Sequence, residues 1–370
     1  MVDRGVFSRL RSQRDRTAYR RQLTIAIERS PALRALPGLL HVPLPVVAAD
    51  GSLAPLRTAL TQEPFVTLAG RPGSGRRLAL QQLARYLVRS RDGAETPPAL
   101  INLPGLDDGE TRPEELLAAE LRAVTDDHNP PPHAPFWRSW PSTARPDSAP
   151  RYLLLIHGWE LLTASRREAW RAALLDLPAG RTGLRAAVAV PHEEPPWPGF
   201  QPLALTAPSR ALVARWLQLL CPAATRAEVE AALAPGGRLH QCSDRLFEVA
   251  LLAWLAPRAG VPASRAELYE RALALFGASA RDHDRDPHAP LGHPQMGRFA
   301  LARRVADEGR FALLAELPPP DRAETALLTA AITGDPSPIL AALWRARRSG
   351  DDVPLAMGRC LRERAPASPV

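Results

Sequence analysis

A glycine-rich turn followed by two arginines is the stretch of this sequence best suited to bind a charged ligand. Its residues are Gly70, Gly73, Ser74, Gly75, Arg76 and Arg77. Phosphate-binding loops follow the pattern Gly-x4-Gly-Lys-Ser/Thr, in which the glycines turn backbone N–H groups toward the phosphates, the lysine reaches the outer phosphates and the hydroxyl holds magnesium. Here Arg76 stands at the lysine position and Arg77 at the hydroxyl position. The pattern therefore predicts a phosphate-loop backbone that has lost the lysine and the hydroxyl side chain that contact the phosphates and magnesium.

A second pair of reactive side chains, His157 and Glu160, follows a strongly apolar run. A histidine beside a glutamate can act as a general base with an orienting partner. The sequence places no nucleophile, however, because it contains no Gly-x-Ser-x-Gly elbow and no Cys/His signature. We therefore predict no catalytic residue, and we expect His157 to be a structural residue at the end of a strand.

Strands and helices alternate between Leu53 and about Leu205, which indicates a parallel sheet covered by helices. Short apolar runs bounded by turn residues predict five strands, at Phe65–Ala69, Ala99–Leu103, Tyr152–Ile156, Ala186–Val190 and Pro202–Leu205. The spacing Ser165-x-x-Glu168 predicts a capping box at the start of the helix after the third strand. The glycine-rich turn then lies between the first strand and the first helix.

From Thr206 onward the apolar spacing is helical. One stripe comprises Leu212, Trp216, Leu219 and Leu220, and Ser264-x-x-Glu267 caps a later helix. Further helices are predicted at Phe299–Glu316, Arg322–Thr333 and Ile339–Arg348. We therefore predict an α/β domain with a P-loop-type parallel sheet, followed by an all-α region that is winged-helix-like and then short and solenoid-like. The predicted boundaries are 1–40 for a basic helical lead-in, 41–205, 206–280, a linker at 281–297, and 298–370.

The composition narrows the class of protein. All 47 basic residues are arginine and the formal net charge is +8. No apolar run is long enough to span a bilayer, and the charged N-terminal residues do not resemble a signal peptide, so we expect a cytoplasmic protein without a membrane partner. Three cysteines lack metal-ligand spacing. Zinc binding by His283, His288 and His293 is the weaker interpretation of a proline-rich loop, and we expect no metal site.

Two stretches are candidate contact surfaces for partners. An arginine cluster near the N-terminus comprises Arg4, Arg9, Arg11, Arg14, Arg16, Arg20 and Arg21. It could meet nucleic acid or an acidic protein, but no aromatic residues interleave it for base stacking, so a solvated helix face is the alternative. The stretch 128–151 is rich in proline and includes Trp137 and Trp140; an ordered partner-contact loop and a linker are both open interpretations.

In this order, the loop, the strands and the helical segment resemble the NACHT-type signalling ATPases of the STAND class. The resemblance covers roughly residues 20–276 and includes Ala263–Phe276, which reads ASRAELYERALALF. The family's third strand ends in Asp-Gly-x-Asp-Glu, whereas this chain has His157, Gly158 and Trp159 followed by Glu160 and a leucine. At the position of the family's phosphate-sensing arginine this chain has a valine. The resemblance thus implies that His157 and Glu160 are remnants of a magnesium site.

Three functional hypotheses follow. The first is a catalytically degenerate NACHT-like scaffold or regulatory subunit of a signalling or defence assembly, which binds a protein partner, forms hetero- or homo-oligomers, and needs no cofactor. The second is an active ATP-binding signalling ATPase in which Arg76 replaces the lysine. Two adjacent arginines at a helix N-terminus can also hold ATP, ADP or phosphate without metal. The third hypothesis, from another class, is an accessory protein that binds nucleic acid through the basic N-terminal arm.

Overall fold

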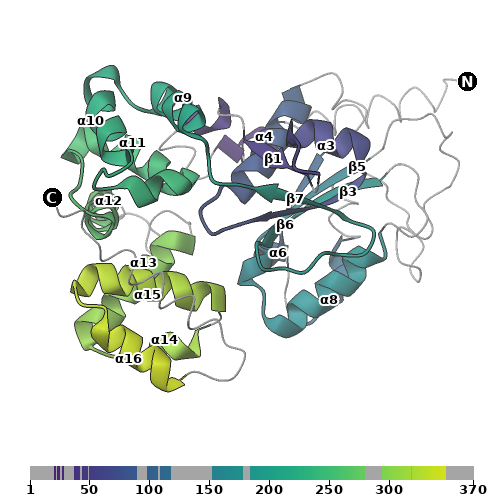
Figure 1. The fold of residues 1–370 in the computed structure, drawn as a ribbon. Coiled ribbons are helices and arrows are strands. Elements are labelled where there is room, and N and C mark those ends of the chain that lie inside the picture. Colours follow the sequence, from purple (N-terminus) through teal and green to yellow (C-terminus); the bar gives the residue numbers. More distant parts are fainter. Residues whose placement is uncertain are drawn as a thin grey trace, which may run out of the picture. The chain divides into compact units, whose positions relative to one another are not determined.

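The computed structural model describes residues 44–89, 98–117, 152–177, 184–279 and 294–346, except 49, 107–108 and 318, together with 21, 23–25, 27–28 and 37–41. The chain divides into two compact units, Met1–Thr206 and Ala207–Val370. Both can be followed in Figure 1. Arg21 has an exposed side chain. The other N-terminal arginines, the 128–151 stretch and the histidines of the predicted linker lie outside the described residues.

In its described part the first unit contains a seven-stranded sheet with the order β2-β1-β7-β3-β6-β5-β4. Its strands are β1 (Pro45–Val47), β2 (Leu53–Pro55), β3 (Phe65–Gly70), β4 (Pro98–Asn102), β5 (Tyr152–His157), β6 (Leu184–Pro191) and β7 (Gln201–Leu205). Strands β3 to β7 run parallel to one another, whereas β1 pairs antiparallel with both β2 and β7. The five predicted strands are confirmed, with small shifts at their ends. The β1–β2 hairpin at one edge was not predicted.

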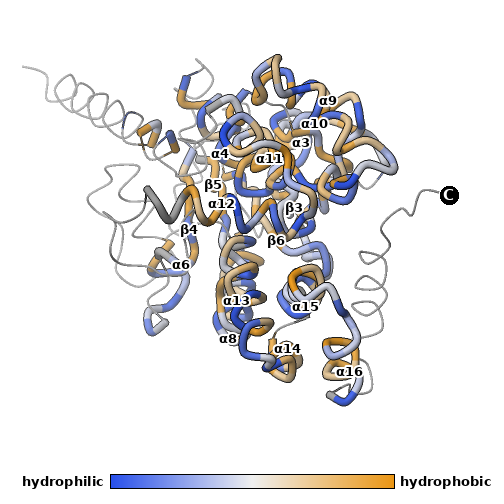
Figure 2. Tube along the Cα trace, turned by 90° about the vertical axis from the view of Figure 1, so that its left-hand side faces the viewer, coloured by the Kyte–Doolittle hydropathy of each residue, from blue (hydrophilic) through white to orange (hydrophobic). Residues whose placement is uncertain are grey.

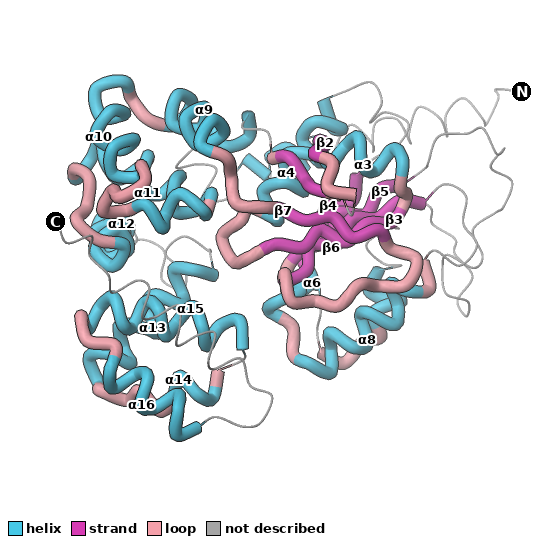
Figure 3. Tube along the Cα trace, in the orientation of Figure 1, coloured by secondary structure: helices cyan, strands magenta, loops and turns pink. Residues whose placement is uncertain are grey.

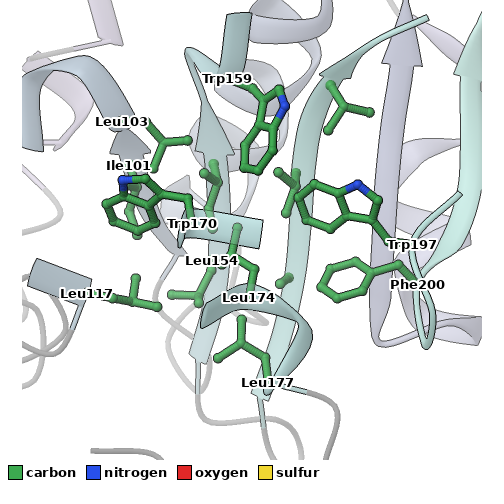
Figure 4. Close-up of a cluster of buried hydrophobic side chains, with 14 of the residues drawn as sticks. Ile101, Leu103, Leu117, Leu154, Trp159, Trp170, Leu174, Leu177, Trp197 and Phe200 are labelled. Carbon is green, nitrogen blue, oxygen red and sulfur yellow. The ribbon is translucent and has the colours of Figure 1, made fainter. Parts of the chain in front are cut away.

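Helices cover both faces of this sheet. Helices α3 (Leu56–Gln62) and α4 (Arg76–Arg89) lie on one face, and α8 (Ala164–Leu175) lies on the other (Figure 1). Side chains alternate along a strand, so Leu154 and Ile156 of β5 join the core beneath α8 (Figure 4). The predicted capping box of α8 is wrong. Thr163 caps this helix instead, because its side chain accepts a hydrogen bond from the backbone N–H of Arg166.

The described residues of the second unit form helices joined by loops, without strands, as Figure 3 shows. The helices are α9 (Arg210–Leu220), α10 (Ala223–Leu233), α11 (Leu246–Ala259), α12 (Arg265–Ser279), α13 (Pro294–Glu308), α14 (Leu313–Glu316), α15 (Pro319–Thr333) and α16 (Ser337–Ala346). A winged helix requires a β-hairpin, so that part of the prediction is not confirmed. The hydropathy along these helices can be followed in Figure 2.

Two boundaries in this unit differ from the prediction. Helix α13 begins at Pro294, inside the predicted linker, because proline is well suited to a first helical turn. The predicted helix Phe299–Glu316 is interrupted at Gly309, whose φ of 64° lies in the left-handed region that favours glycine. The cap predicted at Ser264 is confirmed, since Ser264 Oγ accepts the N–H of Glu267 at 3.2 Å.

Among the described helices, none combines the length and the apolar character needed to cross a membrane.

Candidate functional site

The glycine-rich turn joins β3 to α4, as the sequence predicts. Gly73 and Gly75 have φ values of 81° and 99°, a region that residues with a side chain rarely adopt. The N–H of Ser74 donates to the carbonyl oxygen of Arg71 at 3.1 Å, and the N–H of Ala79 donates to that of Gly75 at 2.8 Å. The strand, turn and helix therefore have the backbone arrangement that the sequence predicts for a phosphate loop, at the carboxyl end of a central strand.

Side chains of the loop itself occupy the space beside Gly70. A Cβ atom at this glycine would lie 2.5 Å from Ser74 Oγ and 3.2 Å from Arg76 Cγ. Ser74 Oγ is buried and has no hydrogen-bond partner within the described part of the chain. A buried hydroxyl without a partner is uncommon, so a hydrogen bond from a ligand would satisfy it. Gly70 therefore has no room for a side chain, because Ser74 and the stem of Arg76 lie against it.

Arg76 makes an ion pair with the glutamate that follows β5. Its Nη2 atom lies 3.5 Å from Glu160 Oε1, and the arginine side chain is only 9% exposed. Glu160 belongs to the short 3-10 helix η3 (Trp159–Leu161). The structure thus brings together two side chains that are 84 positions apart. The carboxylate that remains at this site neutralises an arginine.

The other half of the site comprises Arg77 and His157, which are close enough for the arginine charge to affect the histidine. Burial, and secondarily the charge of Arg77, lowers the pKa of His157 to about 3, so this histidine is neutral at pH 7. Partial desolvation also lowers the pKa of Arg77, while the charge of Glu160 opposes that shift. Arginine nevertheless stays charged in proteins, and Arg77 as a whole residue is exposed. Two guanidinium groups therefore lie near one carboxylate, an arrangement that disfavours a divalent cation and suits an anion.

A second carboxylate, Glu194, supports the segment that carries Glu160. Trp159 Nε1 donates to Glu194 Oε2 at 3.2 Å, and Trp197 Nε1 donates to Glu194 Oε1 at 3.1 Å. Arg171 of α8 forms an ion pair with the same carboxylate. The two indole rings lie 4.8 Å apart (Figure 4). Sequence reasoning missed Glu194, although an acidic pair one residue after the end of β6 was a visible signal.

A close backbone contact fixes the turn after β5. Gly158 has a φ of 90°, and a Cβ there would lie 2.5 Å from Pro104 Cδ and 3.1 Å from Asn102 Oδ1. Asn102 at the end of β4 is in register with His157. Only glycine fits this position without strain. The direction in which the chain leaves β5, and hence the position of Glu160, depends on this glycine.

The strand order brings these groups to one edge of the sheet. Strand β6 lies between β3 and β5, so the phosphate loop and η3 flank its carboxyl end. Ligands of open parallel sheets bind beyond the carboxyl ends of the strands, where the connections diverge. At that end β6 presents Val190 and Pro191, of which Pro191 is in register with Gly70. Neither of these two residues of β6 contributes a polar side chain to the site.

In the described part of the chain, no three His, Cys, Asp or Glu residues gather in a way that could hold a metal ion. The residues present do not fit a magnesium ion at the loop, because an arginine and a neutral histidine stand where oxygen ligands are needed.

No family model matches the sequence. No curated protein matches it either. Among solved structures, the chain is similar to a chain in the structure of Drosophila ORC bound to DNA, with 14% identity, coverage of 81% of each chain and a TM-score of 0.35. A likeness at this level shows neither a family nor a function, so the functional argument depends on the site itself.

Proposed function

We propose that this protein is a P-loop-type α/β protein that has lost magnesium-dependent nucleotide hydrolysis and serves as a scaffold or regulatory subunit. One observation supports this most strongly: Arg77 and a neutral His157 stand together where a phosphate loop requires a hydroxyl and a carboxylate. Phosphoryl transfer at such sites depends on a cation held between those two oxygen ligands. Without that cation, charge on the transferred phosphate is not neutralised.

The magnitude of the charge effect supports the same proposal. Two unit charges about 4 Å apart interact by about 4 kcal/mol at an effective dielectric constant of 20. An interaction of that size changes a binding constant by roughly a thousandfold. Arg77 adds a repulsive term of this kind for a divalent cation, and the histidine removes an attractive one. Both changes weaken magnesium binding, so the protein is proposed not to act as an enzyme.

The sequence resemblance to NACHT-type proteins suggests the setting of this scaffold. Active members switch between states according to the bound nucleotide. A member without magnesium chemistry would stay in one state and contribute surfaces to a cytoplasmic signalling or defence assembly. The partner would be another protein or a further copy of the chain. This setting is a proposal from sequence alone.

Calorimetric titration with ATP, with and without magnesium, tests the proposed function. We expect magnesium to leave ATP binding unchanged or to weaken it, and we expect no ATP turnover. The matched variants are Arg76→Ala at the loop and Arg89→Ala at the exposed end of the same helix. Micromolar ATP binding that magnesium strengthens, with turnover that only Arg76→Ala abolishes, would instead establish the active ATPase.

A second candidate function is metal-free binding of ATP, ADP or phosphate at the same loop. The two arginines and the buried, unpartnered Ser74 Oγ favour it. Charge-assisted hydrogen bonds from guanidinium groups can hold phosphate oxygens without a cation. ATP binding in the presence of a chelator that is lost in Arg77→Ala, and kept in Arg89→Ala, would support this function.

A further inference from the structure

The second unit contains a hollow of about 520 Å³ between helix α16 and the turn that joins α13 to α14. Cavities of about 300 to 1,000 Å³ are typical of sites that enclose a small molecule, so this hollow has room for a large side chain. The hollow is separate from the phosphate loop, which belongs to the first unit. Nothing in the proposed nucleotide chemistry uses it.

One face of α16 forms the first wall. Pro338, Ala341, Ala342 and Arg345 line the hollow, and their spacing of three, four and seven residues places them on one side of the helix. Another side of the same helix packs into the core of the unit through Ile339 and Leu343. Apart from Arg345, this wall is apolar and made of small side chains, which leave room for a larger apolar group from outside.

The turn after α13 forms the second wall. Gly309, Arg310, Phe311 and Ala312 contribute to it. The left-handed φ of Gly309 reverses the chain, and the N–H of Arg310 donates to the carbonyl oxygen of Val305 at 3.1 Å. These constraints fix the backbone of the turn, so that Arg310 and Phe311 line the hollow opposite α16, while Phe311 also packs against the core of the unit. This wall combines an apolar ring with a positive charge.

Both charged residues that line the hollow are arginines. Arg310 is 63% exposed and lies 3.4 Å from Glu308, which is also exposed. An exposed pair of this kind contributes at most about 1 kcal/mol, so it does not occupy Arg310 strongly. Arg345 is exposed as well, and the neighbouring Trp344 is 50% exposed. No acidic residue is among the lining residues that the structure describes.

We propose that this hollow binds an acidic peptide segment of a partner protein. A bulky apolar side chain of the peptide would enter between Phe311 and the alanines of α16, and flanking carboxylates would pair with Arg310 and Arg345. Charge complementarity favours an acidic occupant, and the exposed Trp344 beside the hollow extends the apolar contact, since exposed tryptophan and arginine are common anchors of interfaces. This inference deepens the scaffold function proposed above, because it describes the partner's chemistry.

Selection from a display library of random peptides against the full chain tests this proposal, followed by fluorescence anisotropy with the best enriched peptide. We expect enriched peptides with acidic residues around a large apolar one, and an affinity that falls with salt because the charges are exposed. Arg310→Ala and Arg345→Ala should each weaken binding up to about fivefold, which corresponds to about 1 kcal/mol for an exposed pair. Arg303→Ala and Arg304→Ala, made singly, each remove the same charge from exposed positions of α13 outside the hollow and should leave the affinity unchanged.

A filling variant separates the hollow from general charge effects. Ala342→Leu should weaken peptide binding while both arginines remain, and Ala227→Leu on the exposed face of α10 is its control. Circular dichroism confirms that each variant is folded. The proposal is wrong if no acidic peptides are enriched, or if substitutions at Arg303 and Arg304 weaken peptide binding as much as those at Arg310 and Arg345. It is also wrong if binding appears only after residues 349–370 are deleted, since the chain itself would then fill the hollow. ATP plays no part in this assay, so its failure would leave the account of the phosphate loop untouched.

Discussion

Replacing Glu324 by glutamine should destabilise the second unit, because this carboxylate holds a buried charge cluster together. Glu324 of α15 forms ion pairs with Arg245, which precedes α11, and with Arg265 of α12. Arg265 also donates to Glu248 Oε1, from Nη2 at 2.6 Å and from Nε at 2.9 Å, and the hydroxyl of Tyr269 donates to the same oxygen at 2.8 Å. Two guanidinium groups thus share two buried carboxylates.

The expected loss follows from two separate estimates. Burial alone would raise the pKa of Glu324, but the charges of Arg265 and Arg245 outweigh burial and lower this pKa to about 2 from 4.5. The difference corresponds to about 3 kcal/mol of stability at neutral pH. Removing one partner of a buried ion pair typically costs 3 to 5 kcal/mol, so about 3 kcal/mol is the expected loss. A loss of that size lowers the melting temperature of a unit of this size by roughly 10 °C.

The sign of the pH dependence is determined by the lowered pKa. The contribution of Glu324 is fully present above pH 4.5 and is lost as the pH falls toward 2, because the carboxylate then becomes protonated in the folded state as well. The glutamine variant has no such group. The difference in stability between the two proteins should therefore be largest near pH 7 and shrink steadily in acid.

Hydrogen exchange of the amides in α11, α12 and α15 measures this loss in the full chain, which avoids assigning one transition to two units. Glu230→Gln on the exposed side of α10 serves as the control and should change nothing measurable. A loss below about 1 kcal/mol at pH 7, or a loss that stays constant down to pH 3, would refute the reasoning.

Three further changes test the account at other places. Gly158→Ala should destabilise the first unit by at least about 2 kcal/mol in urea titrations, because Gly158 has a positive φ and the added Cβ would lie 2.5 Å from an atom of Pro104. If this substitution left the free energy of unfolding unchanged, the described turn would be contradicted. Combining Arg77→Thr with His157→Asp restores a hydroxyl and a carboxylate, so magnesium should strengthen ATP binding about tenfold or more in calorimetry, and an equal magnesium effect in the parent chain would count against the proposal. Deleting residues 1–21 should weaken any salt-sensitive binding to DNA or RNA, and salt-insensitive or absent binding would eliminate the nucleic-acid hypothesis.

The strands could be predicted because each central strand is a continuous apolar run bounded by turn residues. Strands β3 and β5 are buried on both faces, so their sequences carry a strong signal. Strands β1 and β2 have three residues each, and this is too short for a periodic pattern. The predicted face of α9 was partly wrong. Leu219 is 49% exposed, whereas the unpredicted Leu217 is 1% exposed, because a stripe of leucines fits more than one helical face.

The candidate site could be predicted in its parts but not in its contacts. The glycine pattern indicates the loop, and the apolar run before His157 indicates that this residue ends a strand; the strand order that brings the two together was not predicted and comes from the structure. The ion pair between Arg76 and Glu160 depends on rotamers that no spacing encodes. The cluster around Glu324 was not foreseen for a similar reason, since Arg245 lies 79 positions away in the sequence and only tertiary packing joins them.

Electron paramagnetic resonance of manganese(II) with ATP and the full chain tests the central claim most directly, because Mn²⁺ substitutes for Mg²⁺ at oxygen sites. With Arg77 and the neutral His157 at the loop, adding the protein should leave the Mn–ATP signal unchanged, while Arg77→Thr combined with His157→Asp should alter it. A stoichiometric change of the signal with the unaltered chain, abolished by Arg76→Ala, would show that the loop still holds a divalent cation and would contradict the account.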